Sequence, residues 1–345
     1  MDIFKQDAFS LVSMLEAFEE VDYQPTTVRQ LGIYPTERVY TPSVDIENRA
    51  GVLSLIPTSP RGAPIPDHRL TEKRKIRSFN VPRIAKDDTI HASEILGMRA
   101  FGRESEMMQV MAEVDRRING PVGILRDVEL TWENMALGAA QGLLLDADGS
   151  TLYDYFSEFG ITQATELDFD LDNATPATGA LYLMCQKVIK QMMVASKGAW
   201  TTQTRVIGLC GEAFWNDLIV HPEIQKLWEL QIQGGFQDGL QEFLGYAQRV
   251  TYGGITFVCY RGTDDGSTVA IGTDKCKFIP MNAPGVFSKV FAPGESFSHI
   301  GGAGRDFYPL IVPDRDRDMW VKVEIYSYPL FICKRPAMLQ RAKRT

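Results

Sequence analysis

Residues 52–81 read VLSLIPTSPRGAPIPDHRLTEKRKIRSFNV, and this stretch decides the fold that the sequence predicts. The apolar run at 52–56 and the alternating run at 73–81 are typical of two β-strands. The segment between them is rich in proline and glycine, which favours a stiffened turn. We therefore expect a long β-hairpin at this point in the chain.

The hairpin region is strongly basic. Residues 61–86 hold eight basic and two acidic side chains, a net charge of +6 in a chain of 345 residues whose formal net charge is −8. The basic residues are Arg61, Arg69, Lys73, Arg74, Lys75, Arg77, Arg83 and Lys86. Few apolar side chains are available to anchor this segment to its own core. We therefore expect it to project from the body and to dock onto adjacent copies of the chain.

A segment of opposite charge follows at 146–172, with eight acidic side chains and no lysine or arginine. Two interpretations stay open: both segments are merely solvated surfaces, or the basic hairpin of one copy lies over the acidic segment of a neighbour. In the second case, the opposed charges mainly set specificity and register. The candidate contact residues between subunits are Arg69, Lys73, Arg74, Lys75, Arg77, Asp146, Asp148, Asp154, Glu158, Asp168 and Asp170.

The residues before the hairpin carry little local pattern. Residues 7–20 place Ala8, Leu11, Leu15 and Phe18 on one stripe, which predicts a short amphipathic helix. The sequence is then interrupted by prolines up to about residue 48. Such a segment is typical of a disordered tail or of an arm that lies on another surface.

Helices are expected over much of the next hundred residues. One is predicted at 103–119, a second begins at Pro121, and a third is capped by Thr175 with Pro176 at its first position. The second helix has an apolar seam of Ile124, Val128, Trp132, Met135 and Ala139. Between the second and third helices, LLLDADGSTLYDYF at 143–156 predicts a hairpin around an Asp-Gly turn.

From about residue 201 the pattern changes to short alternating elements, which predicts a separate mixed α/β lobe. Strands are expected at 205–210, 254–260, 268–272 and 276–281, and helices at 212–220 and 222–233. A Gly/Pro-rich stretch at 284–313 leads out of the lobe. It is followed by WVKVEIY at 320–326, whose alternation predicts a strand with one buried face.

The sequence offers no credible catalytic or metal site, and no cofactor is expected. The segment DADGS at 146–150 lacks the Gly and Glu that a calcium loop needs at its sixth and twelfth positions. The segment DFDLDN at 168–173 alternates like a strand with a solvated acidic face. Cys210 and His221 do not fit a nucleophile elbow with an orienting acid. The five cysteines lack zinc-binding spacing and predict buried free thiols.

Nothing in the sequence predicts a membrane partner. The N-terminus lacks the positive start and apolar run of a signal peptide. The apolar stretch at 135–145 is too short to span a bilayer. We therefore expect a protein of the cytoplasm.

Several blocks along the chain resemble the lambda-type, or E, family of phage major capsid proteins, which has the Hong Kong 97-type capsid fold. The blocks are TERVY (36–40), LSLIPTSPRGAPI (53–65), DADGSTLYDYFSEFG (146–160), LCGEAFWNDLIVHPEI (209–224), GGITFVCYRG (253–262), VFAPGE (290–295) and YSYPLFICKRPAML (326–339). They cover nearly the whole chain. No single block is diagnostic, but in this order they are fairly specific.

The resemblance implies an α+β fold and a division of the chain. It implies an N-terminal arm at 1–48, an extended loop at 49–88 that is the β-hairpin, and a long spine helix with a peripheral domain at 89–200. An α/β axial domain would follow at 201–315. A C-terminal strand at 316–345 would return to the peripheral domain.

The function implied is that of a major capsid protein without enzymatic activity. The protein would self-assemble into hexamers and pentamers that form the icosahedral shell of a tailed phage around its double-stranded DNA, without sequence-specific binding. It would assemble in the host cytoplasm and reside in the virion. Separate scaffold and portal proteins, and in some cases a decoration protein, would be its partners. Lys73, Lys75 and Lys86 lie near the loop, but no acceptor motif accompanies them for a covalent cross-link.

Two alternatives remain open from the sequence. One is an encapsulin-like nanocompartment shell, which shares the fold and holds a protein cargo. The other is a cytosolic enzyme with a site in the 201–310 lobe. The missing catalytic constellation and the long extrusions argue against the enzyme, and particle size would separate it from a shell.

Overall fold

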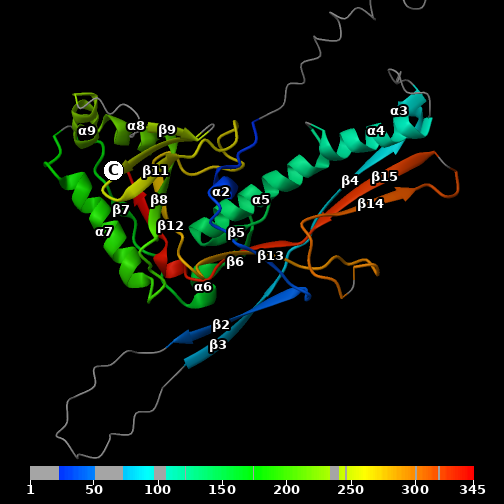
Figure 1. Ribbon diagram of the computed structural model, residues 1–345, viewed down its shortest axis with the longest axis horizontal. Helices are drawn as coiled ribbons and strands as arrows, with labels where there is room; N and C mark the ends of the chain where they lie inside the picture. The colour runs from blue at the N-terminus through cyan, green and yellow to red at the C-terminus, as the bar shows by residue number, and fades with distance from the viewer. Residues whose placement is uncertain are drawn as a thin grey trace, which may run out of the picture.

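The computed structural model describes residues 23–50, 73–96, 106–120, 122–173, 175–233, 241–244, 247–299, 301–317 and 319–345. The helix expected at 7–20 and the strand expected at 52–56 lie outside these residues. Figure 1 shows a lobe built on a large sheet, an elongated part along a pair of helices, and a hairpin that extends away from both.

The lobe contains a seven-stranded mixed sheet in the order β7-β17-β12-β8-β11-β10-β9. The β11–β8 and β17–β7 pairs are parallel, and the other neighbours are antiparallel. In sheet order, the strands are Leu167–Asp168, Gln340–Lys343, Lys275–Met281, Arg205–Cys210, Ile255–Cys259, Ala247–Tyr252 and Gln241–Leu244. Three helices belong to this lobe: α7 (Ala180–Ala195), α8 (Glu212–Val220) and α9 (Pro222–Gln233).

Strand β8 lies at the centre of the sheet because its sequence, RVIGLC, is apolar on both faces. All of its residues after Arg205 are buried, as expected of a strand that is covered on both sides. One core contains Val206 and Cys210 of β8, Phe214 of α8, and Cys185 of α7. The predicted strand at 205–210 and both predicted helices, at 212–220 and 222–233, are confirmed.

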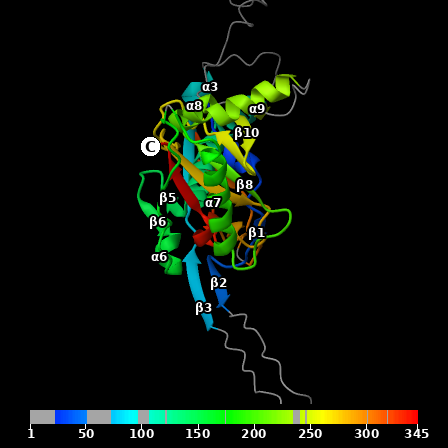
Figure 2. The ribbon, with the colours of Figure 1, turned by 90° about the vertical axis from the view of Figure 1, so that its left-hand side faces the viewer.

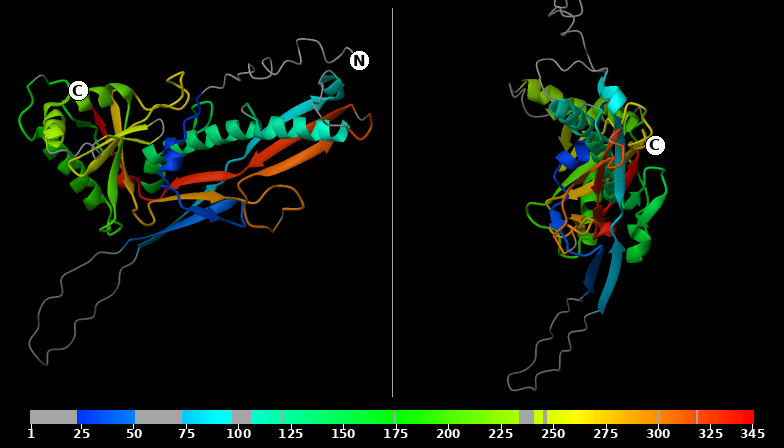
Figure 3. Two further views of the ribbon diagram at one scale, coloured as in Figure 1. Left: turned by 45° about the horizontal axis from the view of Figure 1, so that its top comes forward. Right: turned by 90° about the vertical axis from the view of Figure 1, so that its right-hand side faces the viewer.

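The elongated part contains two helices and a three-stranded antiparallel sheet, seen side by side in Figure 3. The helices are α4 (Glu106–Asn119) and α5 (Ile124–Gln141), and a short helix α3 (Ala92–Leu96) precedes them. The sheet has the order β14-β15-β4, with bounds Tyr308–Pro313, Trp320–Ser327 and Ile84–His91. Val323 and Ile325 on β15 are buried, which confirms the strand with one buried face.

A second three-stranded sheet and a small hairpin pack around the end of α5. The sheet has the order β1-β13-β16, with bounds Thr36–Arg38, Phe287–Phe291 and Pro329–Cys333. The hairpin consists of β5 (Leu143–Leu145) and β6 (Thr151–Asp154) and leads into α6 (Tyr155–Phe159), which confirms the predicted Asp-Gly hairpin. All five residues of the predicted α5 seam are buried. A 3-10 turn at Pro336–Met338 precedes β17.

The long hairpin differs from the prediction in its pairing. The strand predicted at 73–81 is present as β3 (Lys73–Asn80), but it pairs with β2 (Ser43–Ala50) rather than with 52–56. The register joins Val44 to Phe79 and Ile46 to Arg77. The sequence SVDIENRA alternates apolar and charged residues, so β2 places Val44 and Ile46 on the face of the hairpin that carries Phe79. The loop therefore begins earlier than expected.

Two expected helix starts are wrong. The helix expected from Pro121 begins at Ile124, because extended Gly123 is its N-cap. A Cβ at Gly123 would lie 2.5 Å from the Ile118 carbonyl oxygen, so this close approach requires glycine. The helix expected from Thr175 begins at Ala180 after Gly179, which is left-handed with φ 85°.

The strand expected at 268–272 is also wrong. Asp265 accepts hydrogen bonds from the backbone of Ser267 and Thr268. A side chain that satisfies nearby backbone amides in this way favours a turn over a strand.

The three strands of the C-terminal segment belong to three different sheets, whereas a single return to the peripheral domain was expected. Strand β15 returns to the elongated part, where it pairs with β4, and β16 pairs with β13. The last strand, β17, instead enters the seven-stranded sheet between β12 and β7. The Gly/Pro-rich stretch at 284–313 also contributes two strands, β13 and β14.

Candidate assembly surface

The β2–β3 hairpin is the most extended described feature of the molecule. Figure 2 shows it leaving the body at one end. The two strands form a sheet of their own. Lys75 is exposed, and Ile76 keeps 70% of its surface accessible on the opposite face of β3. The hairpin therefore leaves side chains of both its faces accessible to another molecule, although a single exposed apolar residue is common on protein surfaces.

The base of this hairpin is anchored to its own subunit. Phe79 is 1% exposed and contacts the rings of Tyr153, Tyr155 and Phe159 at centroid distances of 5.2, 6.0 and 6.2 Å. The Asn80 amide donates to the Tyr153 hydroxyl oxygen at 2.9 Å. The expectation that the hairpin region lacks an apolar anchor is therefore wrong at its base, because one aromatic side chain buries a large apolar area.

The basic candidates fall into three groups. Arg69 lies outside the described residues. For Lys73 and Arg74 the structure gives the backbone of β3, and Lys75 is exposed on the same strand. The Arg77 guanidinium lies over the ring of Phe159 at 4.8 Å, in a cation–π contact within the subunit. The structure therefore brings Arg77 next to the acidic segment of its own chain.

The acidic candidates lie in turns, at a cap and at a sheet edge. Asp146 and Asp148 accept backbone hydrogen bonds in the β5–β6 turn, and Asp154 caps α6 by accepting from the Phe156 amide at 3.0 Å. Glu158 is exposed on α6. The hydrogen bonds that Asp148 accepts from Ser150 lower the pKa of Asp148.

Asp168 and Asp170 follow a different pattern. Both are exposed, while Leu167, Phe169 and Leu171 between and beside them are buried. The Asp168 carboxylate lies 3.5 Å from the Lys343 amine. The Asp170 carboxylate accepts from the side-chain amide of Asn173 at 2.9 Å. The alternation expected for 168–173 is confirmed, although the strand itself ends at Asp168.

The described part of the arm docks on its own subunit, along α5. Gln24 donates to the Arg126 carbonyl at 3.0 Å, and Tyr34 donates to the Ala136 carbonyl at 2.7 Å. Between these contacts, helix α2 (Thr27–Gln30) presents its amides to Glu133. The segment from residue 24 to 34 thus runs beside α5 in the same direction, whereas the sequence predicted a tail or an arm on another surface.

Sequence reasoning missed Phe79 and Glu133. Phe79 is one of three apolar residues in the run KRKIRSFNV, so its place beside Val44 could be predicted only with the correct partner strand. Glu133 is a charged residue next to the apolar seam, and its side chain is fully buried. The small residues Ala136, Ala139 and Ala140 were the available signal, because they indicate that this end of α5 is covered on more than one side.

The chemical groups of the described residues do not form a metal centre or a reactive thiol site. The described residues contain no group of three or more His, Cys, Asp or Glu side chains that could hold a metal ion. Burial raises the pKa of the Cys210 thiol, whose Sγ lies 3.5 Å from Sγ of Cys276, and burial lowers the pKa of His221. A buried thiol with a raised pKa is a poor nucleophile.

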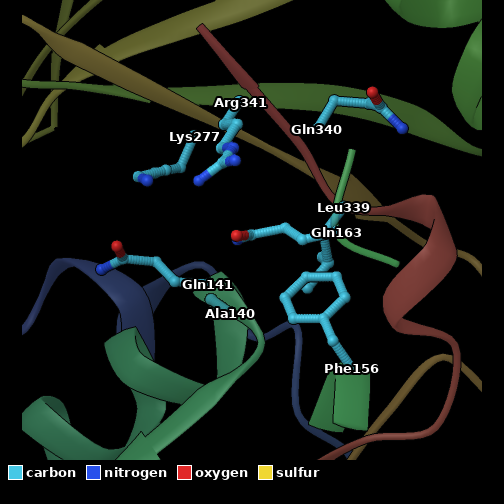
Figure 4. A pocket seen from close by; sticks show the side chains of 8 residues that line it. All are labelled: Ala140, Gln141, Phe156, Gln163, Lys277, Leu339, Gln340 and Arg341. Atoms are coloured by element: carbon cyan, nitrogen blue, oxygen red, sulfur yellow. The ribbon is translucent and has the colours of Figure 1, made fainter. Parts of the chain in front are cut away.

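A small cavity at the end of α5 collects polar groups, as Figure 4 shows. Its volume is about 10 Å³, which leaves room for a single water molecule. Lys277 and Arg341 line it from opposite positions on β12 and β17. Burial and the Arg341 charge lower the pKa of Lys277. The cavity is too small for a substrate.

Comparison with known proteins shows which proteins this chain resembles. The family described as phage major capsid protein E matches residues 10–344. The chain is 27% identical over 304 residues to the major capsid protein of Pseudomonas phage KPP10, with 81% of each chain covered. It is 22% identical to the major capsid protein of Salmonella phage Felix O1, with 93% of each chain covered.

Among solved structures, the fold is similar to the capsid of cyanophage P-SCSP1u. The TM-score is 0.51 at 8% sequence identity, and the match covers 96% of this chain and 91% of that one. The likeness confirms the expected capsid fold with mixed α and β content. Within the described residues, no helix combines the length and the apolar character needed to cross a membrane.

Proposed function

The chain belongs to the phage major capsid protein E family, and from this premise we propose how its surfaces build a shell. The protein is a major capsid protein, a structural subunit of the virion of a tailed phage. The observation that carries the proposal is the β2–β3 hairpin, whose base is fixed by buried Phe79 while Ile76 remains exposed further out. Such a hairpin gains most when a neighbouring copy covers its exposed residues.

The shell is built from hexamers and pentamers of this subunit. Each copy contacts several neighbours, so modest contacts sum to a stable closed particle. The shell encloses double-stranded DNA without sequence-specific binding. The formal charge of −8 supports this role, because a strongly basic lining would bind phosphates and hold the DNA in place.

The parts of the subunit have separate roles in this scheme. Residues 1–48 act as the arm, and the loop at 49–88 is extended at its start by β2, which begins at Ser43. The spine helix α5 and the sheet of β14, β15 and β4 form the peripheral domain. The seven-stranded sheet, which also takes in β17, forms the axial domain around the capsomer centre.

The basic hairpin of one copy lies over the acidic segment of a neighbour. Exposed Lys75 and exposed Glu158, Asp168 and Asp170 support this contact.

Other properties follow from the same role. The subunit carries no catalytic site, and scaffold, portal and in some cases decoration proteins are its separate partners. The family match over residues 10–344 favours a phage shell over an encapsulin-like compartment and over an enzyme with a site in the 201–310 lobe.

The test is a charge reversal on the hairpin. Arg74→Glu with Lys75→Glu should abolish shells seen by electron microscopy and leave a folded subunit by circular dichroism, because the contact becomes repulsive. Arg77 is left unchanged since it lies over Phe159. The matched control reverses exposed Lys187 and Lys190 on α7 and alters the net charge equally.

Rescue distinguishes a specific contact from a general charge effect. Adding Glu158→Lys and Asp170→Lys to the hairpin variant should restore shells if the two segments meet. Intact shells from the hairpin variant alone would rule out the contact. A wild-type chain that forms no megadalton particles, even with its phage's other assembly proteins present, would contradict the shell itself.

A further inference from the structure

Glu133 is a carboxylate buried where three parts of the chain meet. It lies on α5, and none of its surface is exposed. One oxygen, Oε1, accepts from the Val28 amide at 2.8 Å and from the Tyr260 hydroxyl at 3.3 Å. The other, Oε2, accepts from the Arg29 amide at 3.1 Å. One side chain therefore joins the arm, the spine helix and the end of β11.

Burial of a carboxylate is unfavourable unless its oxygens are well satisfied. The nearest cation does not form a direct pair with it. The Arg29 guanidinium instead lies 3.5 Å from Glu129, donates to the Glu129 carbonyl, and lies over the Trp132 ring. Glu133 is thus held chiefly by two amides of the arm, and those amides in turn have this carboxylate as their acceptor.

Several titratable or charged groups face this position. Arg29 comes from α2, Glu129 from the preceding turn of α5, and Tyr260 from the segment after β11. Tyr34 of the arm and Tyr23 next to Tyr260 add two phenols. Arg261 lies over the Tyr23 ring, and Lys289 of β13 lies over Trp132. The contacts on Glu133 itself are the two amides and one phenol.

We propose that Glu133 is the positioning residue of the N-terminal arm, and that it fixes the place of α2 along α5. This inference rests on the proposed shell function, because it is in the shell that an arm must reach a defined neighbour. The Gln24 and Tyr34 contacts on α5 guide the course of the arm. The two bonds to Glu133 hold the short helix α2 at a single position along α5.

Docking of α2 on Glu133 should depend on pH. Burial raises the pKa of Glu133 to about 7, although the amide bonds from Val28 and Arg29 oppose this shift. Release of the arm would expose the carboxyl and return its pKa toward the ordinary value of 4.5. The docked state therefore holds the proton more tightly. By linkage, docking is strongest at low pH and weakens as the pH rises from about 4.5 to about 7.

The experiment measures hydrogen-exchange protection of the Val28 and Arg29 amides in the full-length protein, both unassembled and in shells. In Glu133→Ala, protection should fall at least about tenfold, since both amides lose an ionisable acceptor. Asn134→Ala is the matched control, because it truncates the neighbouring half-buried side chain of α5 and should leave both amides protected. In Glu133→Gln, which keeps one carbonyl acceptor and cannot titrate, protection should no longer vary between about pH 5 and about pH 8.

The shells give an independent readout. Glu133→Ala should yield misassembled particles under conditions in which Asn134→Ala yields normal ones. Unchanged protection of both amides in Glu133→Ala, with normal shells, would overturn the inference and leave the shell function standing. Loss of protection only together with global unfolding would also overturn it, because Glu133 would then be a purely structural residue. A wild-type chain that never forms shells would instead count against the proposed function.

Discussion

The Arg117 guanidinium binds three carboxylates, which come from three elements of the elongated part. It donates to Glu113 of α4 at 2.8 Å, to Asp88 of β4 at 2.7 Å and to Glu94 of α3 at 2.7 Å. Glu113 is only 6% exposed, and hydrogen bonds from Arg116 and Arg117 lower its pKa to about 2. A guanidinium with five donors suits such a junction, whereas a lysine would not.

Replacement of Arg117 by methionine should destabilise the elongated part of the subunit. The variant keeps the aliphatic volume and leaves Glu113 paired with Arg116, but it removes the ion pairs that join α4 to α3 and β4. We expect the free energy of unfolding to fall by about 1–3 kcal/mol in denaturant titrations of unassembled protein. Arg116→Met, at a side chain 54% exposed, should lose at most about 1 kcal/mol. Equal losses from the two variants would contradict the role of Arg117.

At the scale of elements, the sequence predicts regular segments well and long-range pairing poorly. The stripe of α5 and the fully apolar β8 are visible locally, because burial on one or both faces determines which residue types occur there. The pairing of β3 with β2 is not visible, since more than twenty residues separate the two strands along the chain. VLSLI at 52–56 is the more apolar strand candidate, but the alternating SVDIENRA pairs with β3.

For the candidate surface, the sequence predicts where the charged segments lie, but it does not predict which residues are buried. The basic strand, the acidic turn and the alternation at 168–173 follow from residue counts and periodicity. The burial of Phe79 and Glu133 does not follow from them, because each is buried by segments distant in the sequence. Glu133 meets Val28 across 105 positions, so no local pattern could have indicated that contact.

Two residues on β3 separate anchoring of the hairpin from assembly. Phe79→Ala should lower the stability of the unassembled subunit by about 3 kcal/mol and speed exchange of the Asn80 amide, because it empties a buried aromatic site. Ile76→Ala should change that stability by less than about 0.5 kcal/mol, since the side chain is 70% exposed. It should nevertheless raise the concentration needed for shell assembly, measured by light scattering. Assembly unaffected by Ile76→Ala would show that no neighbour covers this face.

At the scale of the whole molecule, two electrostatic effects on assembly oppose each other. Subunits with a formal charge of −8 repel one another, and the repulsion weakens when salt screens it. The contact between basic hairpin and acidic segment attracts, and it weakens under the same screening. The overall rate of assembly therefore does not isolate the hairpin, because salt changes both effects at once.

The ratio of the assembly rates of wild-type protein and a hairpin variant does isolate the hairpin contact. Between about 0.1 M and about 1 M salt the screening length falls from about 10 Å to about 3 Å. A milder variant, Lys75→Gln, changes the net charge by one unit and leaves the general repulsion nearly intact. We expect wild-type protein to assemble several-fold faster than this variant at low salt and at about the same rate at high salt, as measured by light scattering. Lys187→Gln on α7 is the matched control and should keep pace with wild type throughout. A ratio for Lys75→Gln that stays constant across the salt series would mean that Lys75 faces solvent in the shell, because only a charge beside an opposite charge loses its advantage when the field between them is screened.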